Sequence, residues 1–185
     1  MQLSATPLVA AFSLLSGLIL ISCSSPIPYN PPYNDFRPYR VGSYALSAGK
    51  LKDRLLDDLF DQGVQVVTYG NLLTVIMPTD MFFVFDTAEL DDIQHEALNN
   101  IVRLLQNYPY AVFNIAGFTD DVGSWKHKKN LSLRRAQMVR TFLWAHGIDL
   151  CRLTVRGFGD HMDVASNNWA LGSTWNRRVE IQWRF

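Results

Sequence analysis

The sequence runs Gly117-Phe118-Thr119-Asp120-Asp121-Val122-Gly123-Ser124 between a strand pattern and a helix pattern, and the helix then carries Asn130-Leu131-Ser132-Leu133-Arg134-Arg135-Ala136. Glycines in this loop allow a tight backbone and a close approach by a ligand. Asp120 offers a carboxylate beside the N–H groups of the loop, and Arg135 offers a planar fork of donors. The combination suits a ligand with both an ammonium and a carboxylate group, whereas Asp120 would repel a phosphate.

Strand and helix patterns alternate on both sides of this loop. Strands are predicted at 64–69, 72–77, 111–116, 153–156 and 179–183, and helices at 51–60, 91–107 and 131–146. The turn Gly70-Asn71 makes a hairpin of the first two strands, and Pro109 closes the second helix. The inner side of that helix is predicted to carry Ile93, Leu98, Ile101, Leu104 and Leu105. The alternation indicates one α/β sandwich with helices packed on a single sheet.

The motifs in and around the loop resemble those of the OmpA-like peptidoglycan-binding domain. The matching positions are Phe85-Asp86, Leu90, Gly117, Thr119, Asp120, Gly123, Leu131-Ser132, Arg135-Ala136, Gly157-Phe158-Gly159, Ala165-Ser166-Asn167 and Asn176-Arg177-Arg178-Val179. They stand in the family's order over about residues 64–185. The resemblance implies a noncatalytic α/β (α+β) fold, βαβαβ-like with a mixed sheet, that grips the diaminopimelate of peptidoglycan stem peptides.

The resemblance also implies which residues bind the diaminopimelate. Asp120 falls on the position that pairs with the ligand ammonium, and Arg135 on the position that takes a carboxylate. Thr119 and Leu131 fall on positions that line the pocket. Asp86 and Arg178 complete the predicted set, although the motif leaves open which of the two arginines at 177–178 braces the sheet and which reaches the ligand.

Two residues depart from the family's pattern. Phe118 stands where the family has His, and Lys128 stands where it has Asn. Lys128 either adds a second cation for a carboxylate or crowds the pocket. The alternative for Asp120 and Arg135 is an ordinary salt bridge that steadies the loop, which would contribute about 0–1 kcal/mol if exposed.

The amino-terminal residues carry a second resemblance, to the lipobox of bacterial lipoproteins. An uncharged apolar segment, 8–21, ends just before Ser22-Cys23, which is typical of a secretory signal rather than of a fold element. The resemblance implies cleavage after Ser22, a diacylglyceryl group on the Cys23 thiol and an acyl chain such as palmitate on the new amino terminus. Several chains on one residue give stable anchoring. Ser24 suggests transfer to the outer membrane, and a transmembrane helix or an ordinary cleaved signal peptide is the alternative.

We therefore expect a signal peptide at 1–22, a lipidated tether at 23–46 and an OmpA-like periplasmic domain at 47–185. The tether is rich in proline, which favours an extended chain, and also in aromatic residues. Its members are Pro26, Pro28, Pro31, Pro32 and Pro38, with Tyr29, Tyr33, Phe36 and Tyr39. The aromatic residues indicate docking, either on a neighbouring protein or on the tether's own domain.

Composition excludes several classes of function. Lys+Arg and Asp+Glu both number 17, so no overall field attracts nucleic acid. The four histidines (His95, His127, His146 and His161) are scattered without metal-ligand spacing, and no cofactor is expected besides the lipid on Cys23. No nucleophile stands beside a base, so we do not expect an enzyme. Cys151 is predicted to be a buried small hydrophobe or to pair between molecules.

The sequence thus predicts an outer-membrane lipoprotein whose periplasmic domain binds peptidoglycan and ties an envelope assembly to the wall. The alternative is a purely structural subunit of an envelope-spanning secretion complex that has lost wall binding. The small size, the lipobox and the lone OmpA-like domain also resemble lipoproteins of the Dot/Icm type IVB secretion system, which fits a machine component in contact with the wall.

Overall fold

The computed structural model describes the backbone of residues 49–185 and the side chains from residue 53 onward. The predicted signal peptide, Cys23 and the tether lie outside the described residues. The elements in chain order are α1 (Gly49–Asp61), β1 (Gln65–Tyr69), β2 (Leu72–Pro78), α2 (Thr79–Phe82), η2 (Asp92–Gln94), α3 (His95–Gln106), β3 (Phe113–Phe118), α4 (Trp125–Ala145), η3 (Leu150–Arg152), β4 (Leu153–Gly159), α5 (Ala170–Asn176) and β5 (Arg178–Arg184).

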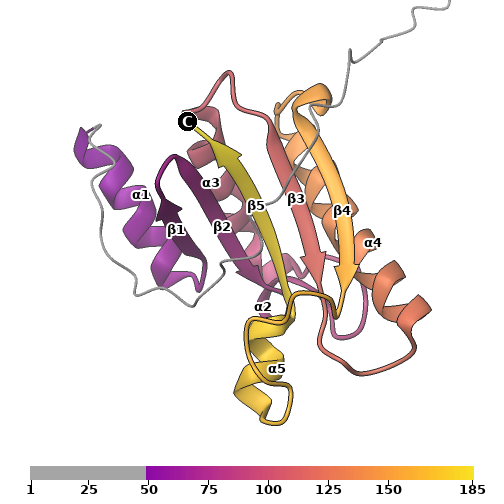
Figure 1. Cartoon of the computed structure of the whole chain (residues 1–185). Coiled ribbons are helices and arrows are strands. Elements are labelled where there is room, and N and C mark those ends of the chain that lie inside the picture. Colours follow the sequence, from indigo (N-terminus) through magenta and orange to yellow (C-terminus); the bar gives the residue numbers. More distant parts are fainter. Residues whose placement is uncertain (1–48) are drawn as a thin grey trace, which may run out of the picture. The chain divides into compact units, whose positions relative to one another are not determined.

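The strands form one mixed sheet in the order β1-β2-β5-β3-β4. β1 and β2 are the antiparallel hairpin predicted around Gly70-Asn71, and β5 inserts antiparallel between β2 and β3. β3 and β4 are parallel, with α4 as the connection between them. The sheet with its helices confirms the α/β sandwich predicted from the sequence (Figure 1).

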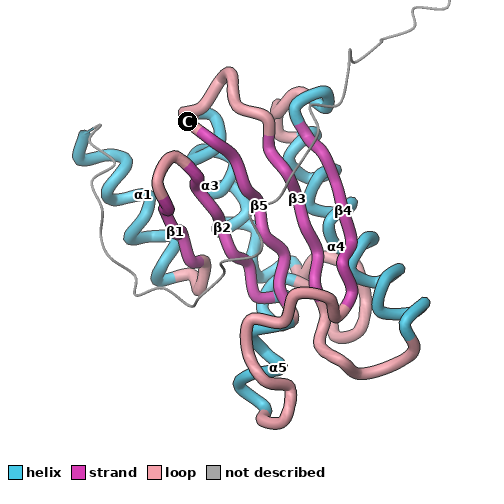
Figure 2. The backbone as a smooth tube through the Cα atoms, in the orientation of Figure 1, coloured by secondary structure: helices cyan, strands magenta, loops and turns pink. Residues whose placement is uncertain are grey.

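The helices α1, α3 and α4 lie on one face of the sheet, behind the strands in the view of Figure 2. The core between these layers holds alternate strand residues such as Ile115 and Ile181 and helix residues such as Ile101 and Leu143, all at most 1% exposed. Trp183 adds a large apolar surface and meets the Phe113 ring edge-on at 5.4 Å. This apolar burial is the main stabilising term of the fold.

Two glycines let α4 approach the sheet closely. A Cβ on Gly117 would lie 2.0 Å from the Ser132 carbonyl oxygen, and one on Gly157 would lie 2.4 Å from the Leu133 backbone nitrogen. Only glycine fits where two backbones come this close. The contact fixes the first turns of α4 against the ends of β3 and β4, so it also fixes the loop between them.

The structure corrects several details of the sequence prediction. Helix α4 begins at Trp125, six residues before the predicted start at Leu131, because Ser124 caps it by accepting from the His127 backbone N–H. Ile93 was placed on the inner side of a helix but is 83% exposed, since the chain there is a short 3-10 turn capped by Asp91. Cys151 is exposed rather than buried. Helix α5 was not predicted at all.

Candidate functional site

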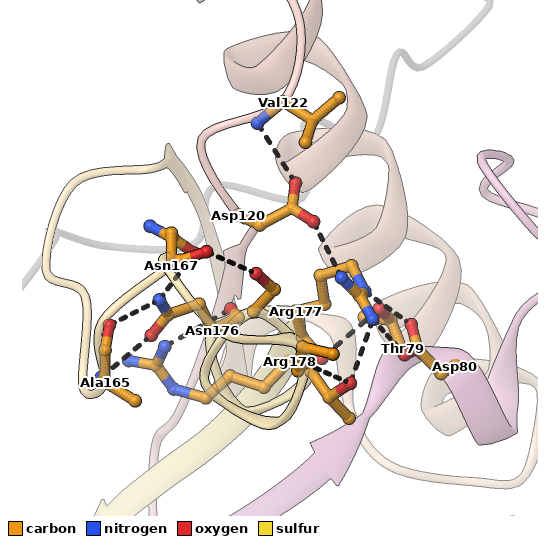
Figure 3. A network of polar contacts seen from close by, with 12 residues as sticks. Thr79, Asp80, Asp120, Val122, Ala165, Asn167, Asn176, Arg177 and Arg178 are labelled. Carbon is orange, nitrogen blue, oxygen red and sulfur yellow. Dashed lines mark hydrogen bonds and ion pairs between the residues drawn. The ribbon is translucent and has the colours of Figure 1, made fainter.

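The candidate site lies where several elements end at one edge of the sheet (Figure 3). Thr119 and Asp120 follow β3, and α2 supplies Thr79 and Asp80 directly after β2. Arg177 stands between α5 and β5. The antiparallel pairing of β2 with β5 brings Pro78 opposite Arg178, so α2 begins beside Arg177. The Thr79 backbone N–H donates to the Arg177 carbonyl oxygen at 2.9 Å, which locks this junction.

Arg177 joins two carboxylates. Its Nε and Nη2 donate to the two oxygens of Asp80 at 2.8 and 2.5 Å, and its Nη1 donates to Oδ2 of Asp120 at 2.7 Å. Nη2 also reaches Oγ1 of Thr174 at 3.0 Å. The hydrogen bonds that Arg177 donates to Asp80, and to a smaller extent the one to Asp120, raise the pKa of Arg177 above its ordinary value, although burial opposes them. The fork-to-carboxylate geometry with Asp80 is the strong, bidentate kind.

Asp120 is held but not enclosed. Its Oδ1 accepts from the Val122 backbone N–H at 3.3 Å, and its side chain is 13% exposed. A carboxylate has room for about four hydrogen bonds. The two contacts with Arg177 and Val122 therefore leave acceptor capacity for a further cation.

Arg135 is the second charged group of the site and is only 4% exposed. Its Nε donates to the Thr87 carbonyl oxygen at 2.8 Å and its Nη1 to Oγ1 of Thr79 at 3.3 Å, while its guanidinium lies 5.6 Å from the centre of the Phe83 ring. Among residues 53–185, no carboxylate lies within ion-pair distance of Arg135, and its Nη2 has no hydrogen-bond partner.

Burial lowers the pKa of Arg135, and the nearby charges of Asp80, Asp86 and Asp120 oppose that effect. Even so, a guanidinium remains charged at neutral pH. A buried cation without a direct anionic partner is costly, so Arg135 is suited to receive an anionic group of a ligand.

A cavity of about 450 Å³ lies beside these residues, between the 86–89 turn and the first half of α4. Its lining residues are Asp86, Thr87, Ala88, Glu89, Ser124, Lys126, His127, Asn130, Leu131 and Arg134. Carboxylates lie on the turn and cations on the helix, so the cavity has an acidic wall and a basic wall. Such a cavity suits a ligand with charges of both signs.

The comparisons with known proteins agree on a family. A sequence model of the OmpA family matches residues 82–177, more than half of the chain. The chain belongs to the OmpA family. It is 33% identical over 128 residues to the Probable lipoprotein YiaD of Escherichia coli K12, covering 69% of this chain and 58% of that protein. It is 36% identical over 96 residues to the Peptidoglycan-binding protein ArfA of Mycobacterium tuberculosis, covering 52% of this chain and 29% of that protein.

A solved structure shows the same OmpA-family fold. The cell wall anchor of the T6SS from Pseudomonas aeruginosa superposes with a TM-score of 0.64 at 30% identity, covering 71% of this chain and 94% of that chain. The present chain therefore spans nearly the whole of that anchor but less than two thirds of YiaD and of ArfA.

The structure places two of the six predicted site residues in the wall of the cavity, whereas Asp120, Arg135, Thr119 and Arg178 do not line it. Asp86 and Leu131 line the cavity, and Oδ1 of Asp86 lies 3.3 Å from Nε2 of His127 across it. Arg135 lies directly behind, bonded to the carbonyl of the lining residue Thr87. Thr119 is 4% exposed, and its Oγ1 has no hydrogen-bond partner within the described part of the chain. A buried hydroxyl without a partner is unusual, and this one stands next to Asp120.

Arg178 lies apart from this group. Its Nε donates to Oε1 of the fully buried Glu180 at 2.6 Å, and its Nη atoms reach the carbonyls of Asn176 and Met162 at 3.3 Å. Its guanidinium also lies 4.0 Å above the Phe118 ring. Through these contacts Arg178 stabilises the end of the sheet, whereas Arg177 binds the carboxylates of Asp80 and Asp120. The predicted contact between Arg178 and a ligand remains a prediction.

The two departures from the family pattern do not line the cavity. The Phe118 ring stacks on Phe158 with centroids 5.2 Å apart. Nζ of Lys128 donates to Oδ2 of Asp160 at 2.5 Å and to the Asp121 carbonyl at 3.3 Å, and its ammonium lowers the pKa of Asp160. Lys128 is thus paired with a carboxylate and steadies the loop against the end of β4.

The sequence did not point to Asp80 or to the basic wall of the cavity. Asp80 matches no motif and reaches the site only through the pairing of β2 with β5. His127 lines the cavity and contacts Asp86 across it. Within residues 53–185 no cluster of metal-ligating side chains occurs, and no helix described there is long and apolar enough to cross a membrane.

Proposed function

We propose that this domain binds the diaminopimelate of peptidoglycan stem peptides, and that a lipid on Cys23 holds it at the periplasmic face of the outer membrane. The protein would then tie an envelope assembly to the cell wall without catalysing a reaction. Membership of the OmpA family supports the proposal, as does the similarity to a peptidoglycan-binding protein and to a cell wall anchor.

The single observation that carries the proposal is that the buried guanidinium of Arg135 has no carboxylate partner among the described residues. Its Nη2 donor has no partner there either, although three carboxylates surround the guanidinium at longer range. The carboxylate of a diaminopimelate would complete its hydrogen bonding, and the neighbouring ammonium would face Asp120 and Asp86. Such a zwitterion satisfies both signs of charge at once.

The affinity of one such site is expected to be modest. A few charge-assisted hydrogen bonds, each about 1.5–3 kcal/mol, must offset the entropy lost on association. The wall repeats its stem peptide many times and the lipid keeps the domain close to it. Avidity therefore strengthens retention beyond what one pocket provides.

The test is a sedimentation assay with insoluble purified cell wall. Asp120→Ala is expected to lose retention, whereas Asp121→Ala, the exposed neighbouring carboxylate, is expected to behave as wild type. A soluble stem peptide containing diaminopimelate should release the wild type and Asp121→Ala from the cell wall. The same peptide with lysine in place of diaminopimelate should not. Equal retention of the folded Asp120→Ala and Asp121→Ala variants would leave the ion pair with Arg177 as a purely structural feature.

A second candidate is a structural subunit of an envelope-spanning secretion complex, such as a type IV secretion system core complex, in which wall binding is secondary or lost. The similarity to a T6SS wall anchor supports a place in such a machine, as does the resemblance in size and layout to Dot/Icm lipoproteins. Co-purification from detergent-extracted membranes separates the two. Stoichiometric protein partners together with unchanged assembly in Asp120→Ala cells would favour the structural subunit.

A further inference from the structure

The segment between β4 and β5 exposes large apolar side chains, although several internal hydrogen bonds connect its backbone. Trp169, Leu171 and Trp175 are 58%, 64% and 54% exposed. Single exposed apolar residues are ordinary, but three within seven residues form a patch of the kind that marks an interaction surface.

Two of the three side chains share one face of α5, and the third, Trp169, stands at its amino-terminal end. Leu171 and Trp175 are four residues apart and so share a face of the helix. The Trp169 indole turns onto the next part of the helix surface, with its Nε1 3.3 Å from the place where a Cβ of Gly172 would stand. We call Trp169, Leu171 and Trp175 the tryptophan platform.

Hydrogen bonds around Asn176 connect the segment that carries the platform. The Asn176 side chain is fully buried and bonds the backbone N–H groups of Val164 and Ala165, the Ala165 carbonyl and the Asn167 side chain (Figure 3). Gly172 fits tightly under the Ser166 carbonyl, which a Cβ would approach to 1.9 Å. Internal hydrogen bonds thus order the loop without help from the exposed rings, so the rings are not needed to hold it together.

The platform adjoins the candidate site. Thr174, next to Trp175, accepts a hydrogen bond from Arg177 at 3.0 Å, and Arg177 donates in turn to Asp120. A polymer whose charged branch lies at Asp120 and Arg135 would therefore pass close to α5.

The chemistry of the segment indicates the partner. Residues 164–176 contain no charged side chain, and the polar residues of this segment, such as Ser166, Asn168 and Thr174, carry neutral hydroxyl and amide groups. A polyanion or an anionic membrane would require cations here. Pyranose rings have apolar C–H faces that stack on indole, and hydroxyl edges that bond to neutral polar groups, and Trp offers a large rigid apolar face with a polar N–H.

We propose that the tryptophan platform is a second subsite, which stacks against the sugar rings of the glycan strand while the charged site holds the stem peptide. This inference rests on the proposed function, because the two subsites would bind two parts of one polymer. Linking two weak contacts in this way raises the overall affinity through the effective concentration of the second.

The experiment uses the full chain, purified in detergent, and two probes: glycan strands freed of stem peptides by an amidase, and a soluble stem peptide containing diaminopimelate. Trp175→Ala and Leu171→Ala are expected to weaken glycan binding about three- to tenfold and to leave peptide binding unchanged. Trp175→Tyr should restore most of the glycan binding. Trp144→Ala is the matched control, since Trp144 is 56% exposed but lies at the far end of α4.

Each outcome decides one subsite. If the wild type does not bind glycan, or if Trp175→Ala and Leu171→Ala bind it fully, the proposed glycan subsite is refuted. The proposed binding of the stem peptide is not affected by that result. Glycan binding that persists while peptide binding is absent would support the platform and refute the proposed function. If the same variants instead abolish association with a second protein or a second copy in gel filtration and leave glycan binding intact, the platform is a protein interface and the proposal is wrong. Thermal unfolding checks that each variant folds.

Discussion

Replacing Arg135 by Met is the sharpest test of the charged site, because it removes the charge while keeping most of the side-chain volume. In the structure the guanidinium makes a hydrogen bond of 2.8 Å to the Thr87 carbonyl and a long one of 3.3 Å to Oγ1 of Thr79. Thr79 keeps its own bond to the Arg177 carbonyl after the exchange. Losing these two bonds costs about 1–2 kcal/mol of unfolding free energy.

Other effects of the exchange partly offset this loss. Arg135 is 4% exposed, and burial lowers its pKa, which shows that its desolvation is unfavourable. A methionine in the same place carries no such penalty and can contact the Phe83 ring through its sulfur. We therefore expect Arg135→Met to fold and to lose at most about 2 kcal/mol of stability.

Binding should respond much more strongly than stability. One guanidinium–carboxylate contact contributes about 1.5–3 kcal/mol, which corresponds to about 10- to 150-fold weaker binding of a diaminopimelate peptide. Isothermal titration with that peptide measures the loss, and chemical denaturation measures stability. Arg140→Met, the same exchange on α4 at a position that does not line the cavity, is the control and should bind as wild type. Unchanged affinity in a folded Arg135→Met protein would refute the assignment of the carboxylate subsite to Arg135.

Three further predictions concern the scaffold. Gly117→Ala forces a Cβ to within 2.0 Å of the α4 backbone and should cost about 3 kcal/mol of stability or more, as measured by urea unfolding. Because the hydrogen bond from Lys128 lowers the pKa of Asp160, the carboxylate stabilises the fold above its unfolded pKa, and this stabilisation is lost as pH falls through the folded pKa. Asp160→Asn should remove this acid-dependent part of the unfolding curve. Asn176→Ala removes four hydrogen bonds inside the β4–β5 segment and should cost about 3 kcal/mol, whereas Asn168→Ala, an exposed neighbour, should change the melting temperature little.

The sequence allowed the fold to be predicted where local chemistry determines it. Gly70-Asn71 between two β-branched runs specifies the hairpin β1–β2, and the strand and helix order specifies the α/β sandwich. The predicted inner side of the second helix failed only at Ile93, because the capped turn at Asp91 shifts the chain out of helical phase before α3 begins. Helix α5 escaped prediction since it is seven residues long, contains Gly172 and exposes its apolar side chains.

The site could be predicted only in part, because sequence motifs do not reveal long-range register. Asp120 and Arg135 lie fifteen residues apart and were expected to face the same ligand, and in the structure the charges of Asp80, Asp86 and Asp120 all act on Arg135. The link through Arg177 depends on where β2 pairs with β5, which juxtaposes residues about one hundred positions apart. No local pattern contains that information. Only the structure shows that Asp80 belongs to the site and that Arg177 and Arg178 make different contacts.

That link explains why Arg135 stays without an ion-pair partner among the described residues even though three carboxylates surround it. Arg177 holds both oxygens of Asp80 and one oxygen of Asp120, so neither side chain is available to turn toward Arg135. The third carboxylate, Asp86, is held in a left-handed backbone conformation (φ 54°) and faces His127. With each acid held by another side chain, the guanidinium of Arg135 would be left for a ligand carboxylate on the proposed function, and Asp120 would keep acceptor capacity for a ligand ammonium. On the proposed function the arrangement would be preorganised for a zwitterion by Arg177, which itself need not touch the ligand.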